Sequence, residues 1–131
     1  MNKVFILFYV FFLLPGCSRT IPRQKDYLGV YRIPKITENS EKIKNTMLTQ
    51  IELTESFYIM RIDRDGDNKF SEDEISKSTY LFAIDENNNP YITITGNDAL
   101  ISLLPDKYYD LLLRRVDETG LVTTMYMIKV R

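Results

Sequence analysis

One stretch of sequence, Tyr91-Ile92-Thr93-Ile94-Thr95, carries the clearest structural signal in the chain. Its apolar and polar side chains alternate, and this period of two is typical of a strand with one buried face. The run Asp85-Glu86-Asn87-Asn88-Asn89-Pro90 precedes it and Gly96-Asn97-Asp98 follows it. Both flanks consist of turn-forming residues. We therefore expect a short strand at 91–95 between two tight turns.

Segments of similar composition lie on both sides of this strand. They are rich in Thr, Ile, Phe and Tyr, which favour strands, and turn residues separate them. The expected strands are 27–33, two strands that follow Met47 and meet at a turn at 54–56, 80–84, 108–116 and 121–130, the last two joined by a hairpin connection at 117–120. The apolar segment 99–104 fits a strand or one helical turn. The polar segment 37–45 fits a loop or a short surface helix.

About seven or eight short strands joined by tight turns predict a mainly β fold in a single domain, residues 27–131. The pattern fits a small antiparallel meander that closes into a barrel, or a two-sheet sandwich. It also allows one short helix after residue 71. In architecture, this layout is similar to the lipocalin-type small barrels found among exported bacterial lipoproteins.

The composition excludes several classes of protein. The chain has 131 residues, 44% of them hydrophobic, which argues against a disordered chain. Its 17 basic and 18 acidic residues give a net charge of -1, so we expect no nucleic-acid partner. There is no histidine and only one cysteine, which excludes an intrachain disulfide and Ser-His or Cys-His catalytic pairs.

The beginning of the chain has the pattern of an export signal. Lys3 is followed by an apolar run at 4–14 and by small residues, which predicts a signal peptide over residues 1–16. The apolar run is too short for a membrane-spanning helix. Leu14-Pro15-Gly16-Cys17 resembles the lipobox of bacterial lipoproteins that are processed by signal peptidase II.

This resemblance implies cleavage after Gly16 and attachment of a diacylglycerol group, with palmitate-type acyl chains, to Cys17. Residues 17–26 are then a lipidated tether that holds the domain at a membrane. Ser18 implies the outer membrane in a cell with two membranes, and the anchor lies in the cell membrane where there is only one. The alternative is an ordinary secretory signal with an incidental cysteine.

A second resemblance lies in the acidic segment 63–74, which is similar to the twelve-residue calcium loop of EF-hands. The segment contains six acidic and two basic residues, and a divalent cation would relieve their mutual repulsion. Asn68 occupies the usual glycine position and is suited to a left-handed backbone. The ligands that the resemblance implies are the carboxylates of Asp63, Asp65 and Asp67, the carbonyl of Lys69, Ser71 directly or through water, and both oxygens of Glu74.

The flanks of this loop leave three interpretations open. Residues 56–62 look extended, whereas the stretch from Ile75 starts like a helix. The segment is a calcium loop inserted between strands and followed by one short helix, a solvated acidic turn without metal, or a true helix-loop-helix. A single site with extended flanks would have a structural role, because paired helices are what open in a calcium sensor.

These observations favour a lipid-anchored envelope lipoprotein that acts as a non-catalytic binding module, stabilised by one calcium ion. Its partner would be an envelope protein, a lipid or a glycan. One alternative is a calcium-dependent envelope or adhesion module. The other is a hydrolase that uses carboxylates alone, for which Asp106, Asp110 and Asp117 are the candidates, although aspartates beside turns usually cap backbone N–H groups.

Overall fold

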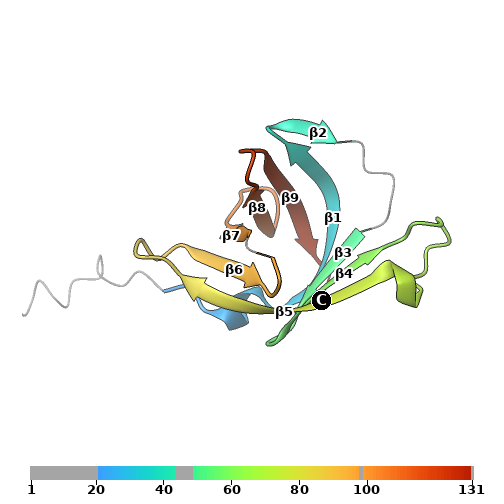
Figure 1. Cartoon of the computed structure of the whole chain (residues 1–131), viewed down its shortest axis with the longest axis horizontal. Coiled ribbons are helices and arrows are strands. Elements are labelled where there is room, and N and C mark those ends of the chain that lie inside the picture. The colour runs from blue at the N-terminus through green and yellow to red at the C-terminus, as the bar shows by residue number, and fades with distance from the viewer. Residues whose placement is uncertain (1–20, 44–48, 98, 131) are drawn as a thin grey trace, which may run out of the picture.

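The computed structural model describes residues 21–43, 49–97 and 99–130, and the protein is mainly β (Figure 1). The described strands are β1 (Gly29–Glu38), β2 (Glu41–Ile43), β3 (Thr49–Leu53), β4 (Phe57–Ile62), β5 (Ile75–Ile84), β6 (Pro90–Ile94), β7 (Leu100–Leu104), β8 (Leu111–Val116) and β9 (Val122–Lys129). Two 3-10 helices, η2 (Gln24–Tyr27) and η3 (Glu72–Glu74), complete the described elements. No helix in these ranges is long and apolar enough to span a membrane.

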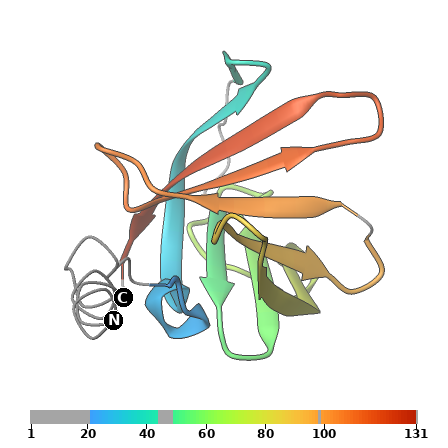
Figure 2. The ribbon, with the colours of Figure 1, turned by 90° about the vertical axis from the view of Figure 1, so that its left-hand side faces the viewer.

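The strands form a closed antiparallel barrel of eight strands, which confirms the barrel expected from the meander pattern. From β3 to β9 each strand pairs with the next one in the chain, and β1 pairs with β3. The barrel closes because β1 also pairs with β9, from Tyr31 opposite Lys129 to Glu38 opposite Thr123 (Figure 2). The short strand β2 extends the sheet beyond the barrel by pairing with β1.

Alternate side chains of the strands fill the barrel and form its core. In β3 and β4 the inward positions include Ile51, Leu53 and Tyr58, all of which are buried. Met127 of β9 is fully buried and Met125 packs against the same core, so the methionines of the last strand serve packing, as their shared face indicated. The buried core cluster consists of Tyr31, Ile33, Ile51, Leu53, Tyr58, Tyr80, Ile92, Ile101, Leu103, Leu111, Leu113 and Met127.

The first strand is longer than its sequence indicated. The strand predicted at 27–33 was expected to stop at Pro34, but β1 continues to Glu38. Its register with β9 shifts between Arg32 and Lys35, so Pro34 lies at an irregularity of the ladder, where the missing N–H is tolerated. The prediction of a loop or surface helix at 37–45 is wrong over the described residues. There the chain forms the β1–β2 hairpin, with Asn39 and Ser40 at positive φ.

The prediction that the stretch from Ile75 starts like a helix is also wrong. Strand β5 begins at that residue, and its first half pairs with β4, for example Ser78 opposite Tyr58. This pairing satisfies the backbone N–H and C=O groups that a helix would have paired locally. The short helix expected after residue 71 is the three-residue η3, and the open segment 99–104 contains strand β7.

Successive strands run in opposite directions, so their connections alternate between the two ends of the barrel. We call these ends the floor and the far end. The floor carries η2, the turns 54–56 and 85–89, the loop 105–110 and the end of β9. The far end carries the β1–β2 hairpin, the loop 63–74 and the turn 117–121. In Figure 1 the loop 63–74 and the turn 85–89 lie at opposite ends of β5.

Candidate metal centre

The acidic loop 63–74 connects β4 to β5 at the far end of the barrel. Asp63 directly follows β4, and Glu74 is the last residue of η3 and directly precedes β5. Both side chains are buried, with 4% of their surface exposed, whereas Asp65 and Asp67 are exposed. The two ends of the loop are therefore held by neighbouring strands of the barrel, and the middle of the loop projects into solvent.

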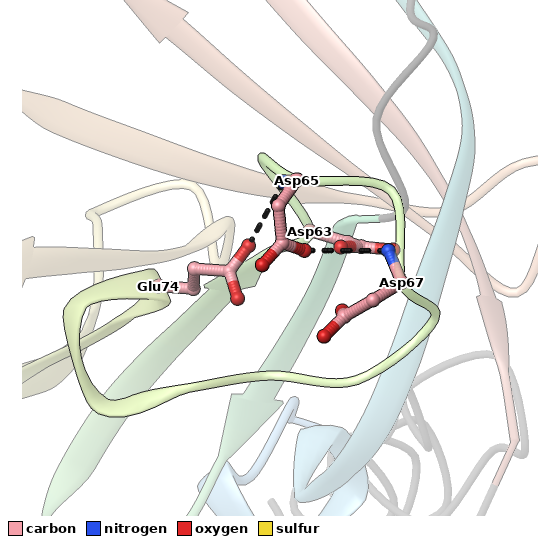
Figure 3. A group of neighbouring side chains, drawn as sticks. All are labelled: Asp63, Asp65, Asp67 and Glu74. Atoms are coloured by element: carbon pink, nitrogen blue, oxygen red, sulfur yellow. Dashed lines mark hydrogen bonds between the residues drawn. The ribbon is translucent and has the colours of Figure 1, made fainter.

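Four carboxylates of the loop converge on one point (Figure 3). One oxygen from each of Asp63, Asp65, Asp67 and Glu74 lies within 4.8 Å of the others. Four oxygens at this spacing can reach a single cation, and this group could therefore hold a metal ion.

Backbone N–H groups hold the Asp63 carboxylate in place. One oxygen accepts a hydrogen bond from the N–H of Gly66 at 3.0 Å and the other accepts one from Asn68 at 2.8 Å. Asn68 has φ +61°, so the residue in the usual glycine position does take the left-handed backbone. The chain thereby turns tightly around the first acidic side chain of the loop.

Glu74 closes the loop from its other end. Its carboxylate accepts hydrogen bonds from the backbone N–H groups of Ser71 at 3.1 Å, Asp65 at 3.4 Å and Arg64, and from the Ser71 hydroxyl at 2.8 Å. The bonds from Ser71 lower the pKa of the Glu74 carboxyl the most. The buried carboxylate is therefore kept ionised, which is the form that binds a cation.

Asp65 shows the effect of crowding four acids together. Its side-chain hydrogen bond with the Asp67 carboxyl raises the pKa of Asp65 to about 6. A proton shared between two carboxyl groups relieves their repulsion, and a cation placed between them would do the same. A metal ion would therefore compete with a proton for this pair of carboxyl groups.

The other two predicted ligands are Ser71 and the backbone carbonyl of Lys69. The Ser71 hydroxyl bonds Glu74 and Asp73, and is placed beside the cluster. The backbone N–H of Lys69 donates a hydrogen bond to the Asp67 carboxylate at 2.9 Å. Cys17, the predicted lipidation site, and the signal peptide 1–16 lie outside the described residues.

The flanks of the loop exclude one of the three interpretations of the sequence. The helix-loop-helix interpretation is wrong, because strand β4 precedes the loop and the three-residue η3 followed by strand β5 comes after it. Residues 85–89 form the tight turn expected before the strand at 91–95, with Asp85 accepting hydrogen bonds from the N–H groups of Asn87 and Asn89.

The aspartates considered for catalysis accept hydrogen bonds from backbone N–H groups. Asp106 accepts hydrogen bonds from the N–H groups of Tyr108 and Tyr109, and Asp110 accepts one from Lys129, all at the floor. Asp117 lies at the far end, where the Thr119 hydroxyl is the main cause of its lowered pKa. These three carboxyl groups therefore do not converge on one site.

An open cleft of about 740 Å³ also lies at the far end, between the turn that joins β6 to β7 and the turn that joins β8 to β9. Its described lining is mixed, with apolar Leu100 and Val116 beside Arg115 and the acidic Asp117 and Glu118. This surface is a second feature of the far end that is accessible to a partner.

Comparison of the chain with protein-family models, with curated proteins and with solved structures gives no match. The sequence indicated the acidic side chains of the loop through their spacing. It did not reveal the backbone donors from Arg64 and Asp65 to Glu74, because these depend on the path of the loop between two strands.

Proposed function

We propose that this protein is a lipid-anchored lipoprotein of the bacterial envelope that acts as a non-catalytic binding module and is stabilised by one calcium ion. The observation that carries the proposal is the convergence of Asp63, Asp65, Asp67 and Glu74 within 4.8 Å. The lipobox-like run that ends at Cys17 supports the anchor.

Calcium is the cation that best fits the chemistry of the loop. It binds six to eight oxygen ligands in flexible geometry, and the loop offers carboxylates, backbone carbonyls and the Ser71 hydroxyl. Magnesium demands nearly ideal octahedral geometry and keeps several of its waters. The abundance of acids over bases in residues 63–74 favours a divalent ion. Affinities of extracellular calcium modules lie at about 10⁻⁴ to 10⁻³ M, which suits a site outside the cell.

The role of the ion is structural. In calcium sensors the ion opens a pair of packed helices. Here β4 and β5, on either side of the loop, pair with each other from Phe57 opposite Thr79 to Arg61 opposite Ile75. An ion bound between them would tie the two strands together at the far end of the barrel. The binding function itself would be carried by the surfaces of the barrel.

A thermal melt in calcium and in chelator tests the proposed ion. At about 5 mM calcium, and with an affinity in the range above, binding to the folded state adds about 1–2 kcal/mol to its stability. For a domain of this size, we expect the melting temperature to rise by roughly 4–10 °C. Asp65→Ala and Glu74→Gln should each abolish this rise, because each removes a carboxylate of the cluster.

Glu72→Gln is the matched control, because it removes an exposed negative charge of the same loop from outside the cluster. It should retain most of the calcium-induced rise. The comparison is made within each variant, so a change in stability without metal does not disturb it. A rise that persists in both Asp65→Ala and Glu74→Gln would refute the site, and an equal rise in magnesium would refute the preference for calcium.

A further inference from the structure

The segment that leads into the barrel is fastened to the floor. The Gln24 side chain donates hydrogen bonds to the backbone carbonyl of Glu55 at 2.8 Å and to the Tyr80 hydroxyl at 3.0 Å. The Tyr31 hydroxyl donates to the carbonyl of Tyr27 at 2.8 Å. The point at which the chain enters the domain is therefore fixed on one end of the barrel.

Tyr31 also connects this segment to the rest of the floor. It pairs with Lys129 in the seam between β1 and β9. Lys129 donates its backbone N–H to the Asp110 carboxylate in the loop 105–110. The entering segment, the end of β9 and this loop thus belong to one surface.

Large hydrophobic side chains are exposed on that surface. Tyr108 is 80% exposed at the tip of the loop 105–110, and Val130 is 47% exposed after β9. Ile21, ahead of η2, is 56% exposed. The ammonium of Lys107 lies 5.5 Å from the centre of the Tyr108 ring.

The lysines of this surface are exposed and form no ion pair with the residues that the structure describes. The exposed carboxylates of Asp106 and Asp110 lie in the same loop as Lys107, and both accept hydrogen bonds from backbone N–H groups. The ion pairs among the described residues are Arg23 with Asp26 and Arg61 with Glu52, so Lys107 and Lys129 take part in neither. The floor patch, which we define as Lys107, Tyr108, Lys129 and Val130, thus combines exposed apolar groups with ammonium groups.

We propose that the floor patch docks on the headgroup region of the membrane that holds the lipid anchor. The acidic loop 63–74 then points away from that membrane. This inference rests on the proposed lipidation of Cys17. Ile21 lies four positions after Cys17, and a fully extended chain spans at most about 3.6 Å per residue. The start of the described chain is therefore within about 14 Å of the anchored residue.

The chemistry of the patch suits a lipid interface. Tyrosine is enriched where membranes meet water, because its ring is apolar and its hydroxyl is polar. Lysine side chains lay their apolar stems along such a surface and place the ammonium at the lipid phosphates. The loop 63–74 and the open cleft lie at the other end of the barrel, so docking would present both to the surrounding medium.

Site-specific fluorescence quenching tests this orientation. The full-length chain is expressed, purified from membranes and reconstituted in vesicles of phosphatidylethanolamine and phosphatidylglycerol. A fluorophore is attached in Lys107→Cys, which retains Tyr108, or in the matched control Glu118→Cys, on an exposed turn at the far end. Lipids that carry a quencher below the headgroup then report proximity to the bilayer.

We expect quenching at position 107 to exceed quenching at position 118 by at least twofold, and Tyr108→Ser in the Lys107→Cys background to reduce it. Flotation of the vesicles separates the two proposals. Protein that floats but is quenched equally at both positions overturns the docking and leaves the anchor intact. Protein that does not float with the vesicles overturns the anchor, and the docking with it.

Discussion

The attachment of η2 to the floor can be tested by removing one side chain. In Gln24→Ala the chain loses the hydrogen bonds from Gln24 Nε2 to the Glu55 carbonyl and to the Tyr80 hydroxyl, at 2.8 and 3.0 Å. Tyr80 keeps its own bond to the carbonyl of Thr54. The substitution therefore removes two contacts between the entering segment and the barrel without disturbing the barrel wall.

The expected magnitude follows from these two bonds. A hydrogen bond within a protein contributes about 0.5–1.5 kcal/mol net. Since Gln24 is half-buried, we expect the free energy of unfolding to fall by about 1–2 kcal/mol. The dependence of this free energy on denaturant should not change, because the surface exposed on unfolding is nearly the same.

Urea unfolding, followed by far-ultraviolet circular dichroism, measures this loss. Lys25→Ala is the control, since it shortens an exposed neighbour in the same 3-10 helix, and surface changes of this kind stay within about 0.5 kcal/mol. If Gln24→Ala and Lys25→Ala have the same stability, the entering segment is not held by these bonds. The proposed orientation of the barrel on the membrane then loses the contact that supports it.

Two further predictions concern the barrel itself. Leu113→Ala, at a fully buried position, should lower the free energy of unfolding by about 3–5 kcal/mol, whereas Leu81→Ala, at a position 73% exposed, should change it by less than about 0.5 kcal/mol; similar losses in urea unfolding would contradict the assigned core. Burial raises the pKa of Tyr31 to about 12 and raises that of Tyr58 as well, from the ordinary value of 10. The unfolded chain therefore releases these protons first, so stability that is present below pH 10 should be lost as the pH rises towards 12. Tyr58→Phe should make the fall in melting temperature across this range less steep than in the parent protein, and identical slopes would refute the assignment.

Strands in which inward and outward side chains alternate along the sequence could be predicted from the sequence alone. The two strands around the turn at 54–56 are an example, because Ile51 and Leu53 mark one inward face and Tyr58 marks the next. The end of β1 could not be predicted in this way. Its continuation past Pro34 depends on pairing with β9, which supplies partners far away in the sequence. The choice between a barrel and a sandwich depended on that same pairing.

The candidate site shows a similar division. The spacing of the acids in 63–74 was visible in the sequence, and the structure brings four of them together. The hydrogen bonds from Gly66 and Asn68 that orient Asp63 come from the backbone, and a sequence does not display them. The floor patch was not predicted either, because Tyr108 and Val130 come from separate segments that only the strand order places at the same end of the barrel.

The seam between β1 and β9 has a consequence for the timing of folding. Tyr31 pairs with Lys129, so the cylinder cannot form until both strands are available, and such distant contacts are slow to assemble. A chain threaded through a translocation channel would stay open until β9 had emerged. Loss of β9 would leave β1 and β8 as bare edges that invite aggregation. The last strand to emerge is thus the one that completes the barrel.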